Sequence, residues 1–462
     1  MPVQYLTSAT ATFLSLQSGL ARPYWEVNYT LSATASTTSG TLGQAYDSAN
    51  DIISLGAIDK EKSVFITGTD KLYAGDMTIR LNNTSGRYSP LNSNSIFYNK
   101  DWHYGIIKIW TGFYNVSGTA MVVQKGTFLI EEIEVVDEAA AYLRCKDKLL
   151  YALDNYIGLP HPSGTSNAKV WTGTVSSKAV ITDLLSGVGL TAGDYDITAG
   201  IDYSDLTLSA KTVGWTLGKI AQSSEGYMFV DNFGKIRYRR LTDDFGYSRT
   251  TWNLNANSNL LSVKYKENVA NLINEVGIKF EENLSAYASV EDTATYPKGH
   301  AFIANNQTVK THAVAQSVIS RNLDNYKQGI AFIEIDNLWM PAVELGDWFN
   351  ITEPLVYLSG SQSHTFEVYK IREDISHFKQ KMYLREIERG LKIGYLSDTG
   401  TSLTSVTFSV SGSGNWLDGF CFLGRETGTA VNPGFDADGN NNNTIDYSGT
   451  PEVSLEAPFV LG

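Results

Sequence analysis

Apolar and polar residues alternate along short segments in the first third of the chain, which is the pattern of half-buried β-strands. The segment 77–81 reads Met-Thr-Ile-Arg-Leu, so one face carries apolar side chains and the other carries polar ones. Runs of β-branched and aromatic residues between turn residues predict further strands at 63–67, 105–110 and 128–135. Residues 32–46 are rich in Ser, Thr, Gly and Ala, and we expect a loop or an extended arm there.

The segment after residue 81 predicts a tight reversal of the chain. Asn and Gly tolerate the positive φ that such a turn requires, and both occur in the run from 82 to 86. The next residues should be extended, because a proline keeps its preceding residue out of the α region, and an apolar strand should follow. We interpret this loop as structural, with the motif residues Asn82, Gly86, Arg87, Tyr88, Ser89 and Pro90.

After residue 137 the pattern changes to helices mixed with strands. Apolar residues at helical spacing predict a helix at 176–188, capped by Ser176 or Ser177, and a second helix at 212–223. Residues 227–239 predict a hairpin, whose turn Asp-Asn-Phe-Gly ends with the residue that has the most backbone freedom. This region is therefore expected to be a small α+β domain.

From about residue 255 the chain returns to strand patterns. Alternating segments predict strands at 260–265, 272–280, 366–371 and 381–388, the last two as closing strands. A turn at Gly346 and Asp347 should feed another strand within 343–352. Residues after about 400 are rich in Gly, Ser and Asn, and we expect a small terminal module or an extension there.

Length, charge and cysteine content narrow the class of protein. A chain of 462 residues suggests about three domains, at roughly 150 residues each. Its net charge of −13 argues against a nucleic-acid grip, which needs clustered Lys and Arg, although DNA can slide past an acidic surface. Cys145 and Cys421 lie far apart, so no disulfide framework is predicted. We expect neither a secretory signal nor a membrane-spanning segment, since no long apolar run occurs.

The residue patterns of common catalytic and metal sites are missing. None of the six histidines pairs with another at helical spacing, which gives a zinc site little support. The glycines of 187–193 follow a predicted helix, whereas a phosphate-binding loop follows a strand. They are better explained as a helix C-cap. We therefore predict no enzyme activity, no cofactor and no metal.

Two acidic segments leave alternatives open. The first is an acidic cluster made of Glu131, Glu132, Glu134, Asp137 and Glu138, which contains enough carboxyls for the catalytic pair of a glycosidase. A solvated strand face, or an acidic wall that lines a lumen, is favoured instead because surface charge runs are common.

The second segment resembles half of a calcium loop, with Asp436, Asp438 and Asn440 as its oxygen-bearing residues. An EF-hand loop would continue with Gly and Glu where Asn441 and Tyr447 stand, so that pattern fails. A looser oxygen cage and an Asn/Gly-rich turn both stay open.

Four features in sequence order resemble the baseplate-hub, or tail-tip hub, proteins of long-tailed bacteriophages. They are the loop 82–90, the helix and hairpin of 212–239, the Asn-Glu-Val strand within 272–280, and the Gly346-Asp347 turn. The resemblance covers about residues 60–395. It implies a mainly β fold with α+β insertions, in which two tail-tube-like β-barrel domains carry smaller α+β domains. The implied division is 1–138 first barrel, 139–255 α+β domain, 256–398 second barrel with associated strands, and 399–462 C-terminal extension or module.

The same resemblance implies a structural virion protein, made in the host bacterial cytoplasm and located at the tail tip. A homotrimer would form a ring that joins a sixfold tail tube to a threefold spike or fibre. Its partners would be a tail-tube or distal tail protein above, a spike, fibre or tip protein below, and the tape-measure protein, while DNA passes without specific binding. The alternatives are a host-surface glycan-binding or fibre-attachment module and, least favoured, a tail-associated cell-wall hydrolase.

Overall fold

In the computed structural model, all described helices and strands lie within one compact unit, Met1–Ile387. The structure describes residues 3–5, 22–32, 37–45, 47, 50–64, 72–114, 119–137, 139–157, 169–198, 201–208, 211–224, 226–240, 251–255, 260–266, 275–280, 284–289, 300–306, 308–326, 332–352 and 364–386. Cys421, Glu138 and the calcium-loop candidates Asp436, Asp438 and Asn440 lie outside these residues.

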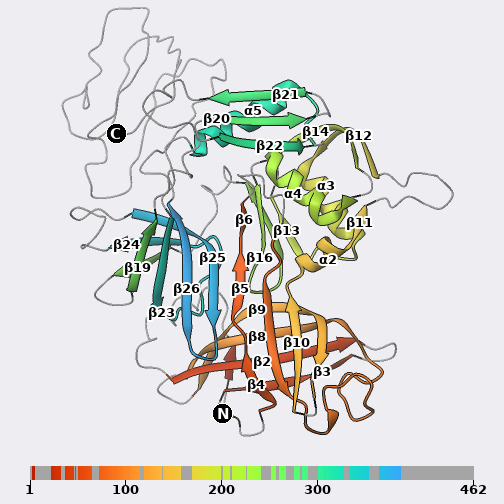
Figure 1. Cartoon of the computed structure of the whole chain (residues 1–462), viewed down its shortest axis with the longest axis vertical. Helices are drawn as coiled ribbons and strands as arrows, with labels where there is room; N and C mark the ends of the chain where they lie inside the picture. Colours follow the sequence, from red (N-terminus) through yellow and green to blue (C-terminus); the bar gives the residue numbers. More distant parts are fainter. Residues whose placement is uncertain are drawn as a thin grey trace, which may run out of the picture. The chain divides into compact units, whose positions relative to one another are not determined.

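One sheet of fifteen strands holds most of the β-structure (Figure 1). Its first half comprises β1 (Val3–Tyr5), β2 (Arg22–Ser32), β3 (Thr38–Gln44), β4 (Ile52–Leu55), β7 (Asp76–Asn82), β8 (Asp101–Tyr114), β9 (Ala120–Val135) and β10 (Ala140–Lys146). The predicted alternation is confirmed in β7, where Met77, Ile79 and Leu81 are buried and the residues between them are exposed. These three side chains enter the apolar core of this half of the sheet.

The described part of the segment 32–46 differs from the expected loop or arm. Residues 38–44 form β3, which pairs antiparallel with β2. Leu42 is fully inside the core, and the strand also satisfies backbone hydrogen-bonding groups of β2 that would otherwise need another partner. The small residues of this segment therefore serve as an edge strand, and their low apolar content hid that role in the sequence.

The second half of the large sheet has a separate apolar core. Its strands are β18 (Thr251–Asn255), β19 (Leu260–Lys266), β23 (Phe332–Leu338), β24 (Trp348–Thr352), β25 (His364–Asp374) and β26 (Lys379–Glu386). The two predicted closing strands are confirmed, because β25 and β26 pair antiparallel along their length. Phe349, Val368 and Leu384 are buried at the centre of this core.

An α+β region follows the first half of the sheet in sequence. It contains α2 (Leu149–Asp154), α3 (Ser177–Gly187), α4 (Val213–Ser224), β6 (Ser63–Val64), β11 (Tyr156–Ile157), β12 (Lys169–Ser176), β13 (Tyr195–Ile197), β14 (Asp202–Leu208), β15 (Lys211–Thr212), β16 (Gly226–Val230) and β17 (Ile236–Arg240). Both predicted helices are confirmed, and Ser176 caps α3 by accepting a hydrogen bond from the backbone N–H of Ala179. The predicted hairpin is β16–β17, with Gly234 at φ +81 in its turn.

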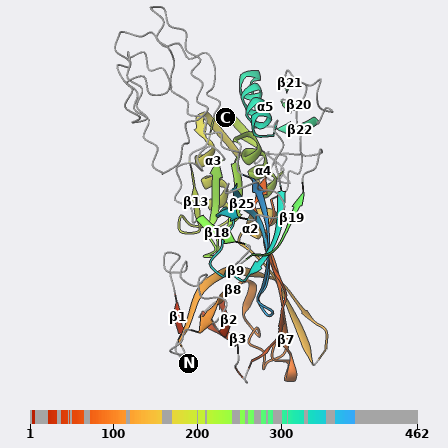
Figure 2. The same cartoon turned by 90° about the vertical axis from the view of Figure 1, so that its left-hand side faces the viewer.

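A second α/β element departs from the predicted second barrel. The strand β20 (Glu275–Phe280) falls within the predicted second barrel, 256–398, but it pairs with β21 (Leu284–Ser289) and β22 (His300–Asn306) in a separate three-stranded sheet. The helix α5 (His312–Tyr326), which the sequence analysis did not predict, lies along this sheet (Figures 1 and 2). Ile278 and Ile319 are fully buried between them. The apolar face of α5 gives β20 a core of its own.

One short stretch of chain joins three of these regions. The strand β5 (Ile58–Glu61) pairs antiparallel with β25 on one side and contacts β7 through a bridge on the other. Two residues later, β6 pairs with β16 of the α+β region. Between them, the backbone N–H of Lys62 donates to the carbonyl of Tyr369. The two halves of the large sheet are continuous because of this stretch.

The predicted fold class, mainly β with α+β insertions, is confirmed by this arrangement of sheets and helices. The number of barrels and the proposed domain boundaries stay predictions. Among the described helices, none combines the length and apolar character of a membrane span.

We expect Gly112→Ala to destabilise the pairing of β8 with β9 strongly. A Cβ at residue 112 would lie 1.9 Å from the carbonyl oxygen of Met121, which is backbone and cannot move aside cheaply. Overpacking of this kind costs about 1–3 kcal/mol of unfolding free energy. Urea denaturation would measure it, with Gly193→Ala as the control because its nearest neighbour, a Thr191 hydroxyl, is 3.7 Å away. Equal stability of both variants would contradict this close approach.

Candidate functional site

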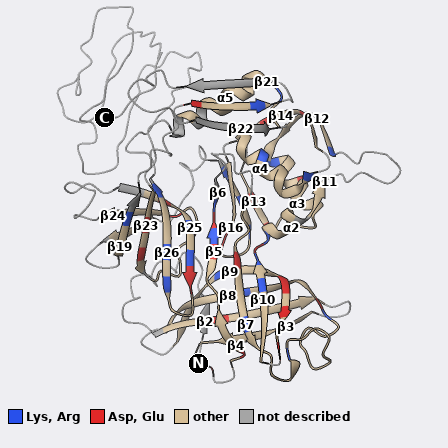
Figure 3. Cartoon of the chain, viewed as in Figure 1, with Lys and Arg blue, Asp and Glu red and all other residues tan. Residues whose placement is uncertain are grey.

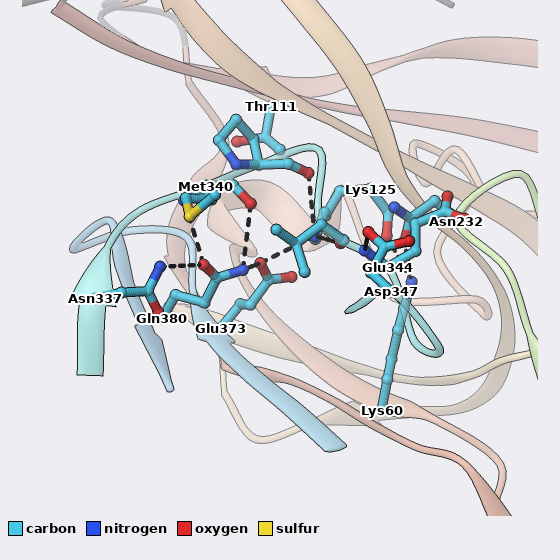
Figure 4. Close-up of polar contacts among 12 residues, drawn as sticks. Lys60, Thr111, Lys125, Asn232, Asn337, Met340, Glu344, Asp347, Glu373 and Gln380 are labelled. Carbon is cyan, nitrogen blue, oxygen red and sulfur yellow. Dashed lines mark hydrogen bonds and ion pairs between the residues drawn. The ribbon is translucent and has the colours of Figure 1, made fainter. Parts of the chain in front are cut away.

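A buried polar junction lies where β5, β9 and the β16–β17 turn meet the second half of the large sheet (Figure 4). It consists of Lys60, Lys125, Asn232, Asn337, Glu373 and Gln380, all of which are buried. The Lys60 ammonium donates to the Lys125 carbonyl and to Asn232 Oδ1, each at 2.7 Å. One lysine therefore connects β5, β9 and the hairpin turn.

Lys125 extends the junction to the second half of the sheet. Its side chain is only 1% exposed, and its ammonium donates to the carbonyls of Val343 at 2.7 Å and Pro341 at 3.1 Å. It also lies 3.0 Å from a carboxylate oxygen of Glu373, which is completely buried on β25. A buried cation is tolerated only when it is paired and hydrogen-bonded, and these three acceptors meet that need.

Gln380 on β26 completes the network around Glu373. Its amide nitrogen donates to Glu373 at 2.7 Å, and its amide oxygen accepts from Asn337 and from the backbone N–H of Met340. The Lys125–Glu373 ion pair and the side-chain amides of Gln380 and Asn337 thus form one connected network. If one member is removed, several other groups lose a hydrogen-bond partner.

Two ionisable groups in and beside the junction, Lys60 and Glu344, have shifted pKa values. Burial, together with the nearby Lys125 cation, lowers the pKa of Lys60 from its ordinary value to about 8. Burial and the Asp231 carboxylate raise the pKa of Glu344, in the loop that supplies carbonyls to Lys125. Each shift reports a group whose charged form is costly to hold in low-dielectric surroundings.

A second buried ion cluster lies next to the first on the same stretch of chain. The Lys62 ammonium is 2.6 Å from Glu367 on β25, and Arg385 on β26 is 2.8 Å from the other oxygen of that carboxylate. The Lys62 ammonium also lies 3.1 Å from the centre of the Tyr227 ring on β16, within the range of a cation–π interaction. Lys62 therefore attaches the α+β region to the second half of the sheet.

The predicted motif loop is ordered, but its path differs from the expected one. Thr84–Gly86 form a 3-10 turn, and Gly86 has φ +69, as the sequence required. Arg87 is helical in backbone conformation instead of extended, and turns continue to residue 100 before β8 begins. A proline three residues later leaves Arg87 free to turn, since the restriction applies to the residue directly before it.

Side chains of the motif hold the loop to its surroundings. Asn82 accepts hydrogen bonds from the backbone and hydroxyl of Thr84, and the Ser89 hydroxyl accepts from Asn83. The buried Tyr88 donates its hydroxyl to Asp51 at 2.7 Å, and Arg87 pairs with the same carboxylate. Pro90 is half-buried at the turn that follows. None of these residues lies among those of the junction.

The predicted Gly346-Asp347 turn is present and lies next to the junction. Gly346 has φ +86, and β24 begins directly after Asp347. One carboxylate oxygen of Asp347 accepts from the backbone N–H of Glu344 and from the Trp252 indole. Burial and the Glu344 carboxylate raise the pKa of Asp347 to about 7.

The acidic run on β9 is exposed. It lies beside the basic residues of the neighbouring strand β10 (Figure 3). Glu131 lies 2.6 Å from Lys146, while Glu132 and Glu134 both pair with Arg144. Asp137 accepts backbone hydrogen bonds that shape the β9–β10 turn. This face therefore carries cross-strand ion pairs in which three glutamates share two basic residues.

One Ser-His-Asp group occurs at the β25–β26 turn but lacks the geometry of a catalytic triad. Ser376 and Asp374 both lie at Nδ1 of His377, at 3.2 and 2.8 Å. A proton relay needs the serine and the carboxylate at opposite ring nitrogens. Among the described residues, no three His, Cys, Asp or Glu side chains gather in a way that suits a metal ion.

No local pattern in the sequence had indicated the members of the junction as site residues. Lys60 lies in the polar run Asp-Lys-Glu-Lys, and Lys125 interrupts the apolar part of β9. The available signal in the sequence was that polar residues lie on both faces of β9 at 124–127. In the structure, all of these polar residues are buried. Only a second layer of protein over this part of the strand explains that burial.

Comparisons with known proteins find similar solved structures, and two of them are tail proteins. No family model and no curated protein matches the sequence. The 43 kDa tail protein of prophage MuSo2 from Shewanella oneidensis is 12% identical, with 79% of this chain and 98% of that chain covered and a TM-score of 0.49. The tail protein from Neisseria meningitidis MC58 is 10% identical, with 79% and 97% covered and a TM-score of 0.49.

A third similar structure is the Escherichia coli c3393 protein, a component of the type VI secretion system described as similar to the bacteriophage T4 tail proteins gp27 and gp5. It is 8% identical, with 77% of this chain and 79% of that chain covered and a TM-score of 0.43. Two of these three structures are thus described as tail proteins, and the third is described as similar to tail proteins.

We expect Lys125→Met to destabilise the chain by about 3–5 kcal/mol, because it leaves Glu373 buried without its cation. Adding Glu373→Gln should recover about 1 kcal/mol or more, since it removes the uncompensated charge. Urea unfolding of the single and double variants would measure the coupling. The control is Lys146→Met in the exposed pair with Glu131, which should cost less than about 1 kcal/mol. A Lys125→Met variant as stable as this control would contradict the proposed role.

We expect Asp347→Asn to gain stability over the wild type as pH rises from about 4 to about 7. Folded Asp347 keeps its proton up to about pH 7, whereas the unfolded carboxyl loses it near pH 4. Its contribution to wild-type stability is therefore complete below pH 4 and lost as pH rises through about 7. Asparagine keeps the acceptor oxygen without that loss, so the variant should be about 1–3 kcal/mol more stable at pH 8.

The matched control for this prediction is Asp194→Asn. Although burial raises the pKa of Asp194, hydrogen bonds from Lys148 and Thr191 outweigh it and lower the pKa to about 2. This carboxylate stabilises the fold above about pH 4, so the variant should lose stability at pH 7 and less of it at pH 3. Unfolding free energies from urea titrations across the pH range would test both signs. Parallel trends in the two variants would refute the assignment.

Proposed function

We propose that this chain is a structural hub protein of a phage tail tip or a related particle. Three copies would form a ring that joins a tail tube to a spike or fibre and lets DNA pass. The proposal rests on the sequence motifs between residues 60 and 395, which occur in the same order as in the hub proteins. The observation that carries it in the structure is the stretch Ile58–Val64, which makes the two halves of the large sheet continuous and attaches the α+β region.

This construction suits a protein that transmits load between larger assemblies. Hinges between regions usually form where few contacts cross, but here paired backbone and two buried ion clusters cross between regions. A ring built from such copies would move as one body. The role implies assembly and formation of a conduit, and it implies no reaction.

The conduit surface is proposed to be acidic or neutral. Passing DNA must not be held, and each Lys or Arg contact with phosphate adds affinity through counterion release. The exposed ladder of β9 and β10 supports this proposal locally, since Arg144 and Lys146 are already paired with glutamates. Net charge of −13 opposes DNA binding over the whole chain.

Domains and partners follow from the same proposal. The proposed domains are 1–138, 139–255, 256–398 and 399–462, with the strands and helix of 275–326 forming a core of their own within the third. A tail-tube or distal tail protein would bind above, and a spike, fibre or tip protein below. A host-surface glycan-binding role is the second candidate, and residues after 399 are where it would reside.

We expect the purified chain, or the chain on its particle, to be a homotrimer. Closure into a ring would cover strand edges such as those of β3 and β19, which end the path of the large sheet. Mass photometry of the full chain and electron microscopy of purified particles would measure the state. A strict monomer that is also missing from the particles would overturn the proposed function.

A further inference from the structure

Lys60 differs from the other two buried lysines of the junction region in its partners. Lys62 and Lys125 lie 2.6 and 3.0 Å from glutamate oxygens, whereas among the described residues no Asp or Glu forms an ion pair with Lys60. Its ammonium instead donates to two neutral oxygens at 2.7 Å, the Lys125 carbonyl and Oδ1 of Asn232. An amine and a side-chain amide therefore meet inside the protein, and these are the two groups from which a new amide bond can form.

The two side chains are shielded from water and held in place. Lys60 is 6% exposed and Asn232 is 5% exposed. Gln124 donates to the backbone carbonyl of Asn232, and the Asp231 carboxylate accepts from two backbone N–H groups of the same turn. An amine 2.7 Å from an amide oxygen lies about 3–4 Å from the amide carbon, given the length of a carbonyl bond. That separation is close to a near-attack arrangement.

The surroundings of Lys60 are those of a nucleophilic amine. Only a neutral amine attacks a carbonyl, and desolvation or a second cation nearby brings lysine to that form. Both act here, since burial and the Lys125 ammonium lower the pKa of Lys60 to about 8. The acidic side chains that face it, Glu373, Glu344 and Asp147, oppose this shift without cancelling it. Roughly a tenth of Lys60 is therefore neutral at pH 7.

An acidic side chain lies beside the amide. The backbone N–H of Asn232 donates to the Glu344 carboxyl, and Figure 4 shows both residues near the ammonium end of Lys60. Burial and the Asp231 carboxylate raise the pKa of Glu344, which favours its protonated form. A protonated carboxyl can give a proton to a leaving nitrogen and take one from an attacking amine. Nucleophile, amide and proton donor are thus gathered in one buried place.

We propose that the side chains of Lys60 and Asn232 join in an amide bond, with Glu344 as the group that transfers the protons. Nζ of Lys60 bonds to Cγ of Asn232, and the bond from Cγ to Nδ2 breaks. The lysine ammonium loses two protons and the leaving nitrogen gains two, so the products are a neutral amide and an ammonium ion. No oxidant or further reactant is needed. The N–H that remains on Nζ keeps its acceptor, the Lys125 carbonyl.

The bond removes an unpaired cation from the interior and ties two regions together. It would link β5 to the β16–β17 turn, across 172 positions of the sequence. A buried cation is costly unless it is paired, and the neutral amide relieves that cost. The inference goes beyond the hub role and does not depend on it, although a covalent joint suits a chain that carries load.

Mass spectrometry of the full-length wild-type chain tests the bond. We expect the denatured protein to be lighter than its sequence by one ammonia molecule, and a tryptic digest to contain a branched peptide that joins Lys60 to Asn232. Lys62 and Lys125 are internal controls, because they are buried against carboxylates and backbone carbonyls. Both should remain free amines. A folded chain of unchanged mass would overturn the inference, and its oligomeric state would still test the hub proposal separately.

Loss of ammonia alone is not sufficient evidence. A cyclic imide formed by Asn232 with its own backbone would lose the same molecule but leave the two peptides separate. That result would overturn the inference, whereas the branched peptide supports it.

The variant Glu344→Gln tests the proton transfer. Glutamine has the same size but no acidic proton, so we expect the bond to form about a hundredfold more slowly. The matched control is Asp347→Asn in the same loop, which should form the bond at the wild-type rate, since Asp347 contacts the Glu344 backbone and the Trp252 indole. Mass spectra taken at intervals after cell-free synthesis would give the rates, and melting temperatures would show that each variant is folded. Equal rates in Glu344→Gln and the wild type, or equal slowing in both variants, would refute the role of Glu344.

Discussion

The need to satisfy buried lysines is the constraint on which the rest of this structure depends. Lys60, Lys62 and Lys125 are buried, and each finds its acceptors on segments far from it in sequence. An ammonium group without partners in such surroundings is far more costly than any single apolar contact is favourable. The first half of the sheet, the hairpin of the α+β region and the second half must therefore come together for all three lysines to be accommodated.

This constraint explains why the strand β9 has two different characters. Its first part, which contains Lys125, is buried on both faces because the β16–β17 turn and the loop before β24 cover it. Its last part is exposed to solvent and carries the ion pairs with β10. Just after its end, the carbonyl of Asp137 anchors the motif loop through Asn83. The strand β9 and the residues just after it thus connect the junction to the motif loop.

The contacts between the regions also support the proposed hub role, because they suit a chain that transmits load as one body. The polar groups of the junction add specificity, since an ion pair with carbonyl and amide partners tolerates few alternative arrangements. The aromatic contact of Phe113 on β8 with Trp339, and of Trp339 with Phe378, adds apolar burial beside them. Together they hold elements that lie more than two hundred residues apart in sequence.

The sequence by itself determined the local structure wherever short-range chemistry decides it. The alternation in 77–81, the Ser176 cap, and the glycines at 86, 234 and 346 each depend on neighbours within a few residues, and each was predicted. Tertiary structure decided the rest. The edge strand β3, the separate sheet around β20 and the helix α5 depend on how several segments pair and pack together, which the pattern of a single segment does not show. Lys60 reads as a solvated residue in a charged run, and only the meeting of three regions makes it a buried link, because the acceptors that hold it come from positions that no local pattern can identify.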